Sequence, residues 1–459
     1  MSFKSLVFLS LAFLCAAFSA RAIGPHEILL VVNEESLDSL YLARVYQRLR
    51  SVPDTNMLRV ALPLDVYDGR GVDISHADFT KHIWGPVSEA LARQETRHVL
   101  AVVLSCGFPT RVIVKDRVPI SITGAVFLRN ALPESDTHWD SVDKGLFASE
   151  LFAGSFNVAT NYGESETFDT SRARLIANMP LPAMMLGFTG ERGTTADQAV
   201  AYLERAATGD HTRPAGTIWF AVNDDVRSKC RHEWIFPQAT NLLASVPGVR
   251  AVVSAGQPGQ NDYPLLGYMT GSRNTRGGML FAPGAFADHL TSWGASFEQS
   301  AQSKVTDWLK NGAAFTAGTV TEPYAVWTKF PHACLFTHYM NGCSAIEALY
   351  LSVFSPLQLL PLGDPLANPW AEKITMQIEA PRGDLSGQVD LKAVIENESS
   401  FFYRYNWYID GKPAGTGRNL IWDTAGLPDG THKIRAVARR QLESVRQQGF
   451  AEITVKVRN

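Results

Sequence analysis

The sequence of 459 residues lacks the local patterns by which many enzymes and cofactor-binding proteins are recognised. It contains no G-x-S-x-G, no H-E-x-x-H, no phosphate-binding loop and no paired C-x-x-C. These absences imply no cofactor and no metal. There is also no run of Lys and Arg, and the formal net charge is −3, which argues against nucleic acid as a partner.

Long apolar runs are also missing, except for one near the N-terminus. Residues 6–18 are apolar but too short to span a bilayer comfortably, and Lys4 supplies a positive charge before them. Ala20, Arg21 and Ala22 then form the small-x-small pattern of a leader cleavage site. We therefore expect residues 1–22 to be a signal peptide. The mature protein is expected to be periplasmic or extracellular, with no integral membrane segment.

Cysteine is scarce, with five in the chain, and Cys15 lies in the expected leader. The other four are Cys106, Cys230, Cys334 and Cys343. In an oxidising compartment an even number invites disulfides. Cys334 and Cys343 are the closest pair in the chain, which favours their pairing, but the sequence leaves all three pairing schemes open. Cys106 or Cys334 as a thiol nucleophile beside a histidine is a further hypothesis.

What the chain does contain is typical of a packed globular protein, with 46% hydrophobic and 19% charged residues. Over residues 23–370, apolar runs such as 27–32, 57–61 and 98–104 alternate with segments of helical periodicity. Ser36 is placed to cap the first of these helices. This alternation predicts an α/β domain with a mostly parallel sheet flanked by helices.

The apolar period changes to two after the segment Gly-Asp-Pro-Leu-Ala-Asn-Pro at residues 363–369. Residues 371–459 contain six short runs of alternating apolar residues separated by turn signals, and Trp407 lies in the third run. This spacing predicts a small all-β immunoglobulin-like sandwich with Trp407 as its core aromatic residue.

Polar residues that are suited to acid–base chemistry follow two of the apolar runs in the α/β domain. Asp288 and His289 lie in the segment 284–294, and Glu322 follows an expected strand at 313–318. Alternatively, Asp288 and Ser292 cap a helix while His289 packs in the interior.

His332 lies shortly after Glu322 and begins a second polar cluster. Together with Cys334 and His338 it has a metal-like spacing, but these three residues are one ligand short of a closed structural zinc site.

Four short motifs carry a resemblance to known proteins. In chain order they are ADHLTSWG (287–294), GTVTEP (318–323), KFPH (329–332) and GDPLANP (363–369). Their order resembles an uncharacterised family of exported bacterial proteins across residues 23–370. The layout is more distantly similar to gingipain-type, caspase-like peptidases, which place His-Gly after one strand and Cys after the next. Here residues 268–271 and 316–319 supply neither, so the resemblance implies a degenerate or repurposed peptidase site.

Taken together, these features predict an exported cell-envelope protein that binds or assembles with a protein or glycan partner. The alternative is a secreted, peptidase-like hydrolase whose site is formed by Asp288, His289, Glu322 and His332. That alternative requires the four side chains to meet in one pocket at the carboxyl ends of the strands.

Overall fold

The computed structural model describes residues 20–63, 66, 71–153, 180–231, 235–396, 402–441 and 445–459. Residues 1–19 of the expected signal peptide lie outside this range, as does much of the irregular segment before residue 180. The first described residues form a short strand, β1 (Ala20–Arg21), which pairs in parallel with β21 (Val445–Arg446) near the C-terminus. The start of the described chain therefore lies beside a segment close to the C-terminus.

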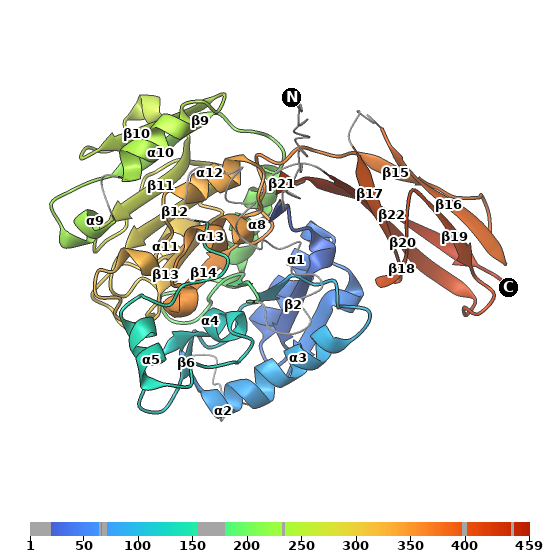
Figure 1. Cartoon of the computed structure of the whole chain (residues 1–459), viewed down its shortest axis with the longest axis horizontal. Helices are drawn as coiled ribbons and strands as arrows, with labels where there is room; N and C mark the ends of the chain where they lie inside the picture. Colours follow the sequence, from blue (N-terminus) through green and yellow to red (C-terminus); the bar gives the residue numbers. More distant parts are fainter. Residues whose placement is uncertain are drawn as a thin grey trace, which may run out of the picture.

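The large domain is organised around a ten-stranded sheet in the order β10-β9-β11-β12-β13-β14-β8-β5-β2-β3 (Figure 1). Its strands, in chain order, are β2 (Ile28–Asn33), β3 (Met57–Val60), β5 (Ala101–Leu104), β8 (Ala183–Met185), β9 (Gly216–Ala221), β10 (Val249–Ser254), β11 (Leu265–Gly271), β12 (Phe281–Leu290), β13 (Phe315–Thr319) and β14 (Leu359–Gly363). A small sheet at its edge contains β4 (Asp73–Ser75), β6 (Arg111–Ile113) and β7 (Ile120–Ser121).

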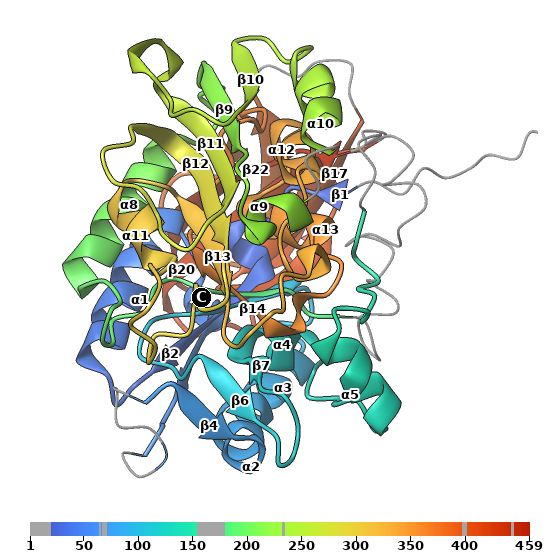
Figure 2. The same cartoon turned by 90° about the vertical axis from the view of Figure 1, so that its left-hand side faces the viewer.

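Helices cover both faces of this sheet, as Figure 2 shows: α1, α8 and α11 lie on one side and α10, α12 and α13 on the other. The longer helices are α1 (Leu37–Arg50), α3 (Gly85–Ala92), α5 (Asp136–Asp143), α8 (Ala196–Thr208), α10 (Ile235–Leu243) and α13 (Ala345–Ser352). The shorter ones are α2 (His76–Phe79), α4 (Ile122–Phe127), α9 (Val226–Cys230), α11 (Thr306–Lys310) and α12 (Cys334–Met340). Ser36 caps α1 as predicted, accepting a hydrogen bond from the Ser39 amide. The mostly parallel α/β prediction is confirmed.

The sheet consists of two parallel halves that run in opposite directions. Within this ten-stranded sheet every described pairing is parallel except that of β13 with β14, where Phe315 pairs with Gly363 and Thr319 with Leu359. As a consequence, the strands of β10-β9-β11-β12-β13 end at one edge of the sheet, and those of β14-β8-β5-β2-β3 end at the opposite edge. Loops at the carboxyl ends of strands therefore form two separate regions.

The C-terminal domain is an antiparallel sandwich, as predicted. One sheet contains β15 (Met376–Glu379), β16 (Gln388–Ile395) and β19 (Asn419–Asp423), and the other contains β18 (Lys412–Thr416), β17 (Tyr403–Ile409), β20 (Gly430–Arg440) and β22 (Gln448–Val457). Trp407 on β17 is fully buried in the sandwich core, and its indole donates to the Gly417 carbonyl. The domain boundary expected at residues 370 and 371 falls between β14 and β15.

One local expectation was wrong. The segment around Asp288 is not capped as a helix, because residues 281–290 form the long strand β12, which pairs with β11 along Gly267–Gly271. On β12, Phe286 and Leu290 face the main core, while Ala285 and Ala287 face a smaller cluster around Trp308. This alternation is typical of a strand with both faces covered.

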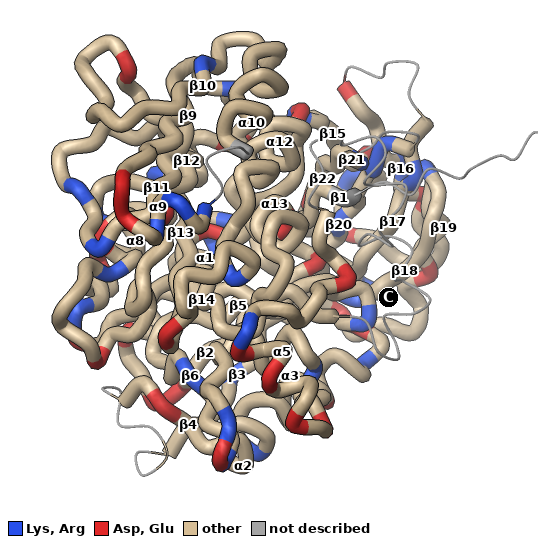
Figure 3. Tube along the Cα trace, turned by 60° about the vertical axis from the view of Figure 1, so that its left-hand side comes forward, with Lys and Arg blue, Asp and Glu red and all other residues tan. Residues whose placement is uncertain are grey.

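A buried ion pair joins the two domains. Arg439 of β20 donates to Glu27, which lies just before β2, and the distance from Nη2 to Oε1 is 2.6 Å. Both side chains are at most 2% exposed. Gln448 also donates to Glu27, and Arg435 donates to the Ser51 carbonyl at the end of α1. Because a buried guanidinium needs a close acceptor, these contacts hold the domains in a defined arrangement. On the trace of the whole chain, acidic and basic residues are interspersed (Figure 3).

Candidate functional site

Asp288, the first of the predicted site residues, forms a closed ion pair. It is fully buried on β12, and Arg231 binds both of its carboxylate oxygens, at 2.7 and 2.9 Å. Burial raises the pKa of Asp288, and the guanidinium opposes this rise by stabilising the charged form. A carboxylate held in this bidentate manner is oriented and neutralised rather than poised to accept a proton.

His289 points to the opposite face of the sheet, because successive residues of a strand alternate. Its Nδ1 accepts a hydrogen bond from the indole of Trp308 at 2.9 Å, and its Nε2 lies 3.3 Å from the Ser303 carbonyl. Burial lowers the pKa of His289 to about 3. The ring is therefore neutral at ordinary pH, with both nitrogens engaged.

His332 is close to Asp288 through a shared guanidinium. Arg231 also donates to the Pro331 carbonyl at 2.8 Å, so the same side chain holds Asp288 and the residue before His332. The His332 ring itself accepts from the Cys334 amide at 3.1 Å. Its Nδ1 is therefore occupied by a neighbouring backbone group.

Glu322 is the fourth predicted residue, and it stays within its own loop. It is half-buried, and one carboxylate oxygen accepts from the Tyr324 amide at 3.0 Å. The structure thus brings Asp288 and the His332 segment together, places His289 on the other face, and shows no hydrogen bond between Glu322 and the others in the described chain.

Cys106, Cys230, Cys334 and Cys343 are free thiols, so the favoured Cys334–Cys343 disulfide is not formed. Cys334 begins α12 and its sulfur lies 3.8 Å from the Ala153 carbonyl. Burial raises the pKa of Cys106 to about 12 and that of Cys230 to about 11, and it raises the pKa of Cys334 as well. These three thiols are protonated at neutral pH, which opposes a nucleophilic role.

The metal-like spacing of His332, Cys334 and His338 does not form a metal centre. His338 is buried, and its Nε2 lies 2.9 Å from the Ala153 carbonyl. Within the described ranges, no group of three or more His, Cys, Asp or Glu side chains is arranged to hold a metal ion. The same part of the chain contains no helix that is both long and apolar enough to cross a membrane.

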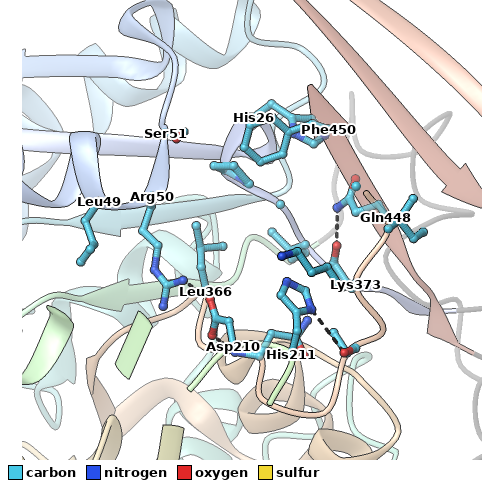
Figure 4. Close-up of a pocket in the computed structure, with 18 residues that line it drawn as sticks. His26, Leu49, Arg50, Ser51, Asp210, His211, Leu366, Lys373, Gln448 and Phe450 are labelled. Carbon is cyan, nitrogen blue, oxygen red and sulfur yellow. Dashed lines mark hydrogen bonds and ion pairs between the residues drawn. The ribbon is translucent and has the colours of Figure 1, made fainter. Parts of the chain in front are cut away.

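A cavity of about 320 Å³ lies where the two domains meet (Figure 4). It is formed by the segment before β2, the end of α1, the loop after α8, the loop after β14 and the start of β22. The residues lining it are Ala22, Ile23, Gly24, Pro25, His26, Leu49, Arg50, Ser51, Asp210, His211, Leu366, Asn368, Ala371, Lys373, Ile374, Gln448, Gly449 and Phe450. Its size falls in the range of small-molecule sites, and domain interfaces are a common place for such sites.

An ionic network forms one wall of this cavity. Arg50 lies between Asp210 and Asp364 and forms ion pairs with both. The Tyr46 hydroxyl donates a hydrogen bond to Asp364 at 2.9 Å. The same carboxylate oxygen accepts a second hydrogen bond from the Leu366 amide at 3.0 Å. Burial raises the pKa of Asp210, and the adjacent Arg50 opposes the rise. The network fixes the loop after β14 against α1.

Two other residues of the cavity wall each contain one polar atom without a hydrogen-bond partner in the described chain. His26 Nδ1 and Asn368 Oδ1 are buried without a hydrogen-bond partner among the described residues. Arg439 has no acceptor atom, so His26 Nε2, at 3.1 Å from its guanidinium, must accept. Burial lowers the pKa of His26 well below its usual value, so the ring is neutral and its proton lies on Nδ1. Both unpaired atoms are themselves inaccessible to solvent, so they lie within the cavity wall, behind the surface that it exposes.

The site residues predicted from the sequence do not include His26, Arg50, Asp210 or Asn368. The available signal was the GDPLANP motif, because its Asp364 and Asn368 both belong to the cavity wall or its network. Residues 365 and 366 of that motif also form a turn. His26 and Arg50 carry no motif, since only the docking of the sandwich makes them part of a cavity.

Comparison of the chain with protein-family models and with curated proteins finds no match.

Proposed function

We propose that this is an exported, non-catalytic binding protein of the cell envelope, built on a repurposed caspase-like domain. Its site is the cavity between that domain and the sandwich, and its ligand is a saccharide. The observation that carries the proposal is the pair of unsatisfied buried groups, His26 Nδ1 and Asn368 Oδ1, in one cavity wall. Buried polar atoms normally have partners, so two unpaired atoms in residues that line one cavity favour an external partner, which reaches them when the wall side chains shift.

The chemistry of the wall supports a sugar. A hydroxyl group donates and accepts at once, so sugar hydroxyls match both the His26 donor and the Asn368 acceptor once the wall side chains shift to expose them. Phe450 adds an aromatic surface near His26, as Figure 4 shows, and Leu366 and Ile374 add apolar area. A mixture of apolar walls and a few placed polar groups is typical of small-ligand sites.

The test is titration of the mature protein with N-acetylglucosamine and with glucose, followed by calorimetry and by saturation-transfer NMR. We expect at least one of them to bind with a dissociation constant of about 1 mM or tighter. Lys373, exposed where it lines the cavity, provides a blocking variant, Lys373→Trp, which should abolish binding. Lys115→Trp, an exposed lysine that does not line the cavity, should leave binding unchanged.

Binding that survives Lys373→Trp, or no binding of either sugar, would contradict the saccharide proposal. The alternative, a secreted hydrolase with Asp288, His289, Glu322 and His332, receives less support because Arg231 neutralises Asp288 and both nitrogens of His289 are engaged. Hydrolysis of a peptide or ester substrate that is lost in His332→Ala would favour that alternative instead.

A further inference from the structure

The first residue after the expected leader has a buried partner far along the chain. The backbone nitrogen of Ile23 donates to Glu347 Oε2 at 3.0 Å. Ile23 is 4% exposed and Glu347 is fully buried. Glu347 lies in the first turn of α13, where the same oxygen accepts from the Ser344 amide at 2.9 Å and from its hydroxyl at 2.6 Å.

Within the described part of the chain this carboxyl group has no cation as a partner. Among the described residues no Lys, Arg or His side chain forms an ion pair with Glu347, and its Oε1 has no hydrogen-bond partner. The charged group that acts on it is Glu27, which has the same sign and is itself paired with Arg439. Burial and Glu27 raise the pKa of Glu347 to about 8. A buried carboxylate needs a positive partner, so the uncleaved chain holds this group protonated.

The sequence places a source of positive charge next to it. The small-x-small pattern of Ala20, Arg21 and Ala22 directs a leader peptidase to the bond between Ala22 and Ile23. Hydrolysis of that bond by water leaves a carboxylate on Ala22 and an α-ammonium group, with three hydrogens, on Ile23. An α-amino group has an ordinary pKa of about 7.7–8.0, so it is largely protonated at pH 7.

We propose that removal of residues 1–22 creates an α-ammonium group on Ile23 that forms a buried ion pair with Glu347. This inference rests on the export that is part of the proposed function. It makes maturation a structural step, because cleavage supplies the charge that the core lacks. The new ammonium group has enough hydrogens to reach both Glu347 oxygens, including the unpaired Oε1.

Cleavage also changes the cavity between the domains. Ala22 lines it, and its carbonyl accepts from Gln448. The strand β1 and the bond from the Ala22 amide to the Arg446 carbonyl, at 3.2 Å, are lost with the leader. The contacts that are removed are hydrogen bonds to β21 and β22, while the contact that is gained is ionic and buried. Maturation therefore removes Ala22 from the cavity wall and places the α-ammonium group of the next residue, Ile23, at the same position in the wall.

The test is a double-mutant cycle on two mature proteins, one beginning at Ile23 and one retaining Ala22, each with and without Glu347→Gln. In the protein beginning at Ile23, Glu347→Gln leaves a buried ammonium group without a counter-charge. It should lower the folding equilibrium constant, measured by urea denaturation at pH 6.5, by about a hundredfold or more. In the protein retaining Ala22, the same change should cost less than about tenfold, because an amide replaces a neutral carboxyl group. Equal effects in the two proteins would overturn the ion pair.

A second measurement covers the case in which Glu347→Gln does not fold. Under native conditions at pH 7, the α-amine of the Ile23 protein should resist acylation by a succinimidyl ester at least tenfold better than that of the Ala22 protein. Equal reactivity would overturn the proposal.

Intact-mass analysis of the exported protein should give Ile23 as its first residue. Another first residue would overturn the cleavage site, whereas a failure of the sugar titration would leave the ion pair unaffected.

Discussion

The Asp288–His289 pair of β12 and the wall of the cavity between the domains are both rich in polar side chains, but they differ in how fully these particular polar atoms are paired. In the first region, Asp288 is bound by Arg231, and His289 is bound on both nitrogens. In the second, His26 and Asn368 each keep one buried polar atom without a partner in the described chain. Charge and histidine content alone therefore do not distinguish a site from a structural network, and the pairing of the individual polar atoms has to be compared as well.

This contrast also bears on which region tolerates change. When side chains pair with one another through hydrogen bonds and ion pairs, removing one of them breaks several contacts and leaves a buried charge without a partner. A wall that keeps unsatisfied atoms has fewer contacts to lose. We therefore expect large stability effects and no ligand effects at Asp288, and the reverse at Asn368.

The largest expected effect comes from breaking the closed network. Arg231→Ala leaves Asp288 buried without its counter-charge and also removes the bond to the Pro331 carbonyl. The free energy of unfolding, measured by urea denaturation, should fall by about 3–5 kcal/mol. The double variant Arg231→Met with Asp288→Leu removes both charges and should recover much of that loss. A single variant as stable as the wild type would show that the ion pair is not structural.

An intermediate effect is expected on acidification. The pKa of His289 is lowered to about 3 in the folded protein, against an ordinary value of about 6.5. The unfolded chain therefore binds a proton between these values while the folded protein does not, so stability is complete above pH 6.5 and is lost as the pH falls. At pH 5 the loss should be about 2 kcal/mol for this residue.

His289→Gln is the control for that pH profile. It removes the titration, so the difference in unfolding free energy between pH 7 and pH 5 should shrink relative to the wild type. The pKa of His338 is likewise lowered, to about 4, so part of the acid sensitivity should remain in this variant. A profile as steep as that of the wild type would mean that His289 is not neutral in the folded protein.

The smallest expected effect on stability is at the cavity. Asn368→Ala removes the unpaired Oδ1 and one bond, from Nδ2 to the Gly342 carbonyl at 3.2 Å. Unfolding free energy should fall by about 1 kcal/mol, the usual value of one hydrogen bond. Sugar binding should nevertheless weaken at least tenfold in the calorimetric titration. A decrease of the unfolding free energy by more than about 3 kcal/mol would contradict this expectation and show that Asn368 is as important for stability as Asp288.

Much of the fold was predictable because local patterns decide it. The Ser36 cap, the apolar runs at β2 and β5, and the period-two strands around Trp407 all appear where the sequence indicated. The pattern was least informative at the centre of the sheet. There β12 carries polar residues that only tertiary partners satisfy, and β14 contains Pro361. Such strands depend on neighbours from distant segments.

The candidate site was less predictable than the fold. Asp288 and His289 adjoin in sequence, but a strand sends them to opposite faces, and the helix that was considered for this segment would not have done so. The cavity is assembled from segments near both ends of the chain and from the loop after β14. His26 and Arg50 belong to it only because the sandwich docks through Arg439 and Arg435. No local pattern records such docking.

The antiparallel seam between β13 and β14 sets the order in which the large domain can assemble. β14 is the last strand of that domain, and it alone joins the two halves of the sheet, pairing with β13 on one side and with β8 on the other. During synthesis, each half emerges with an open edge, and the halves share no strand until residues 359–363 are available. Contacts of such long sequence separation form late and slowly. The chain therefore remains incompletely folded until its large domain is complete.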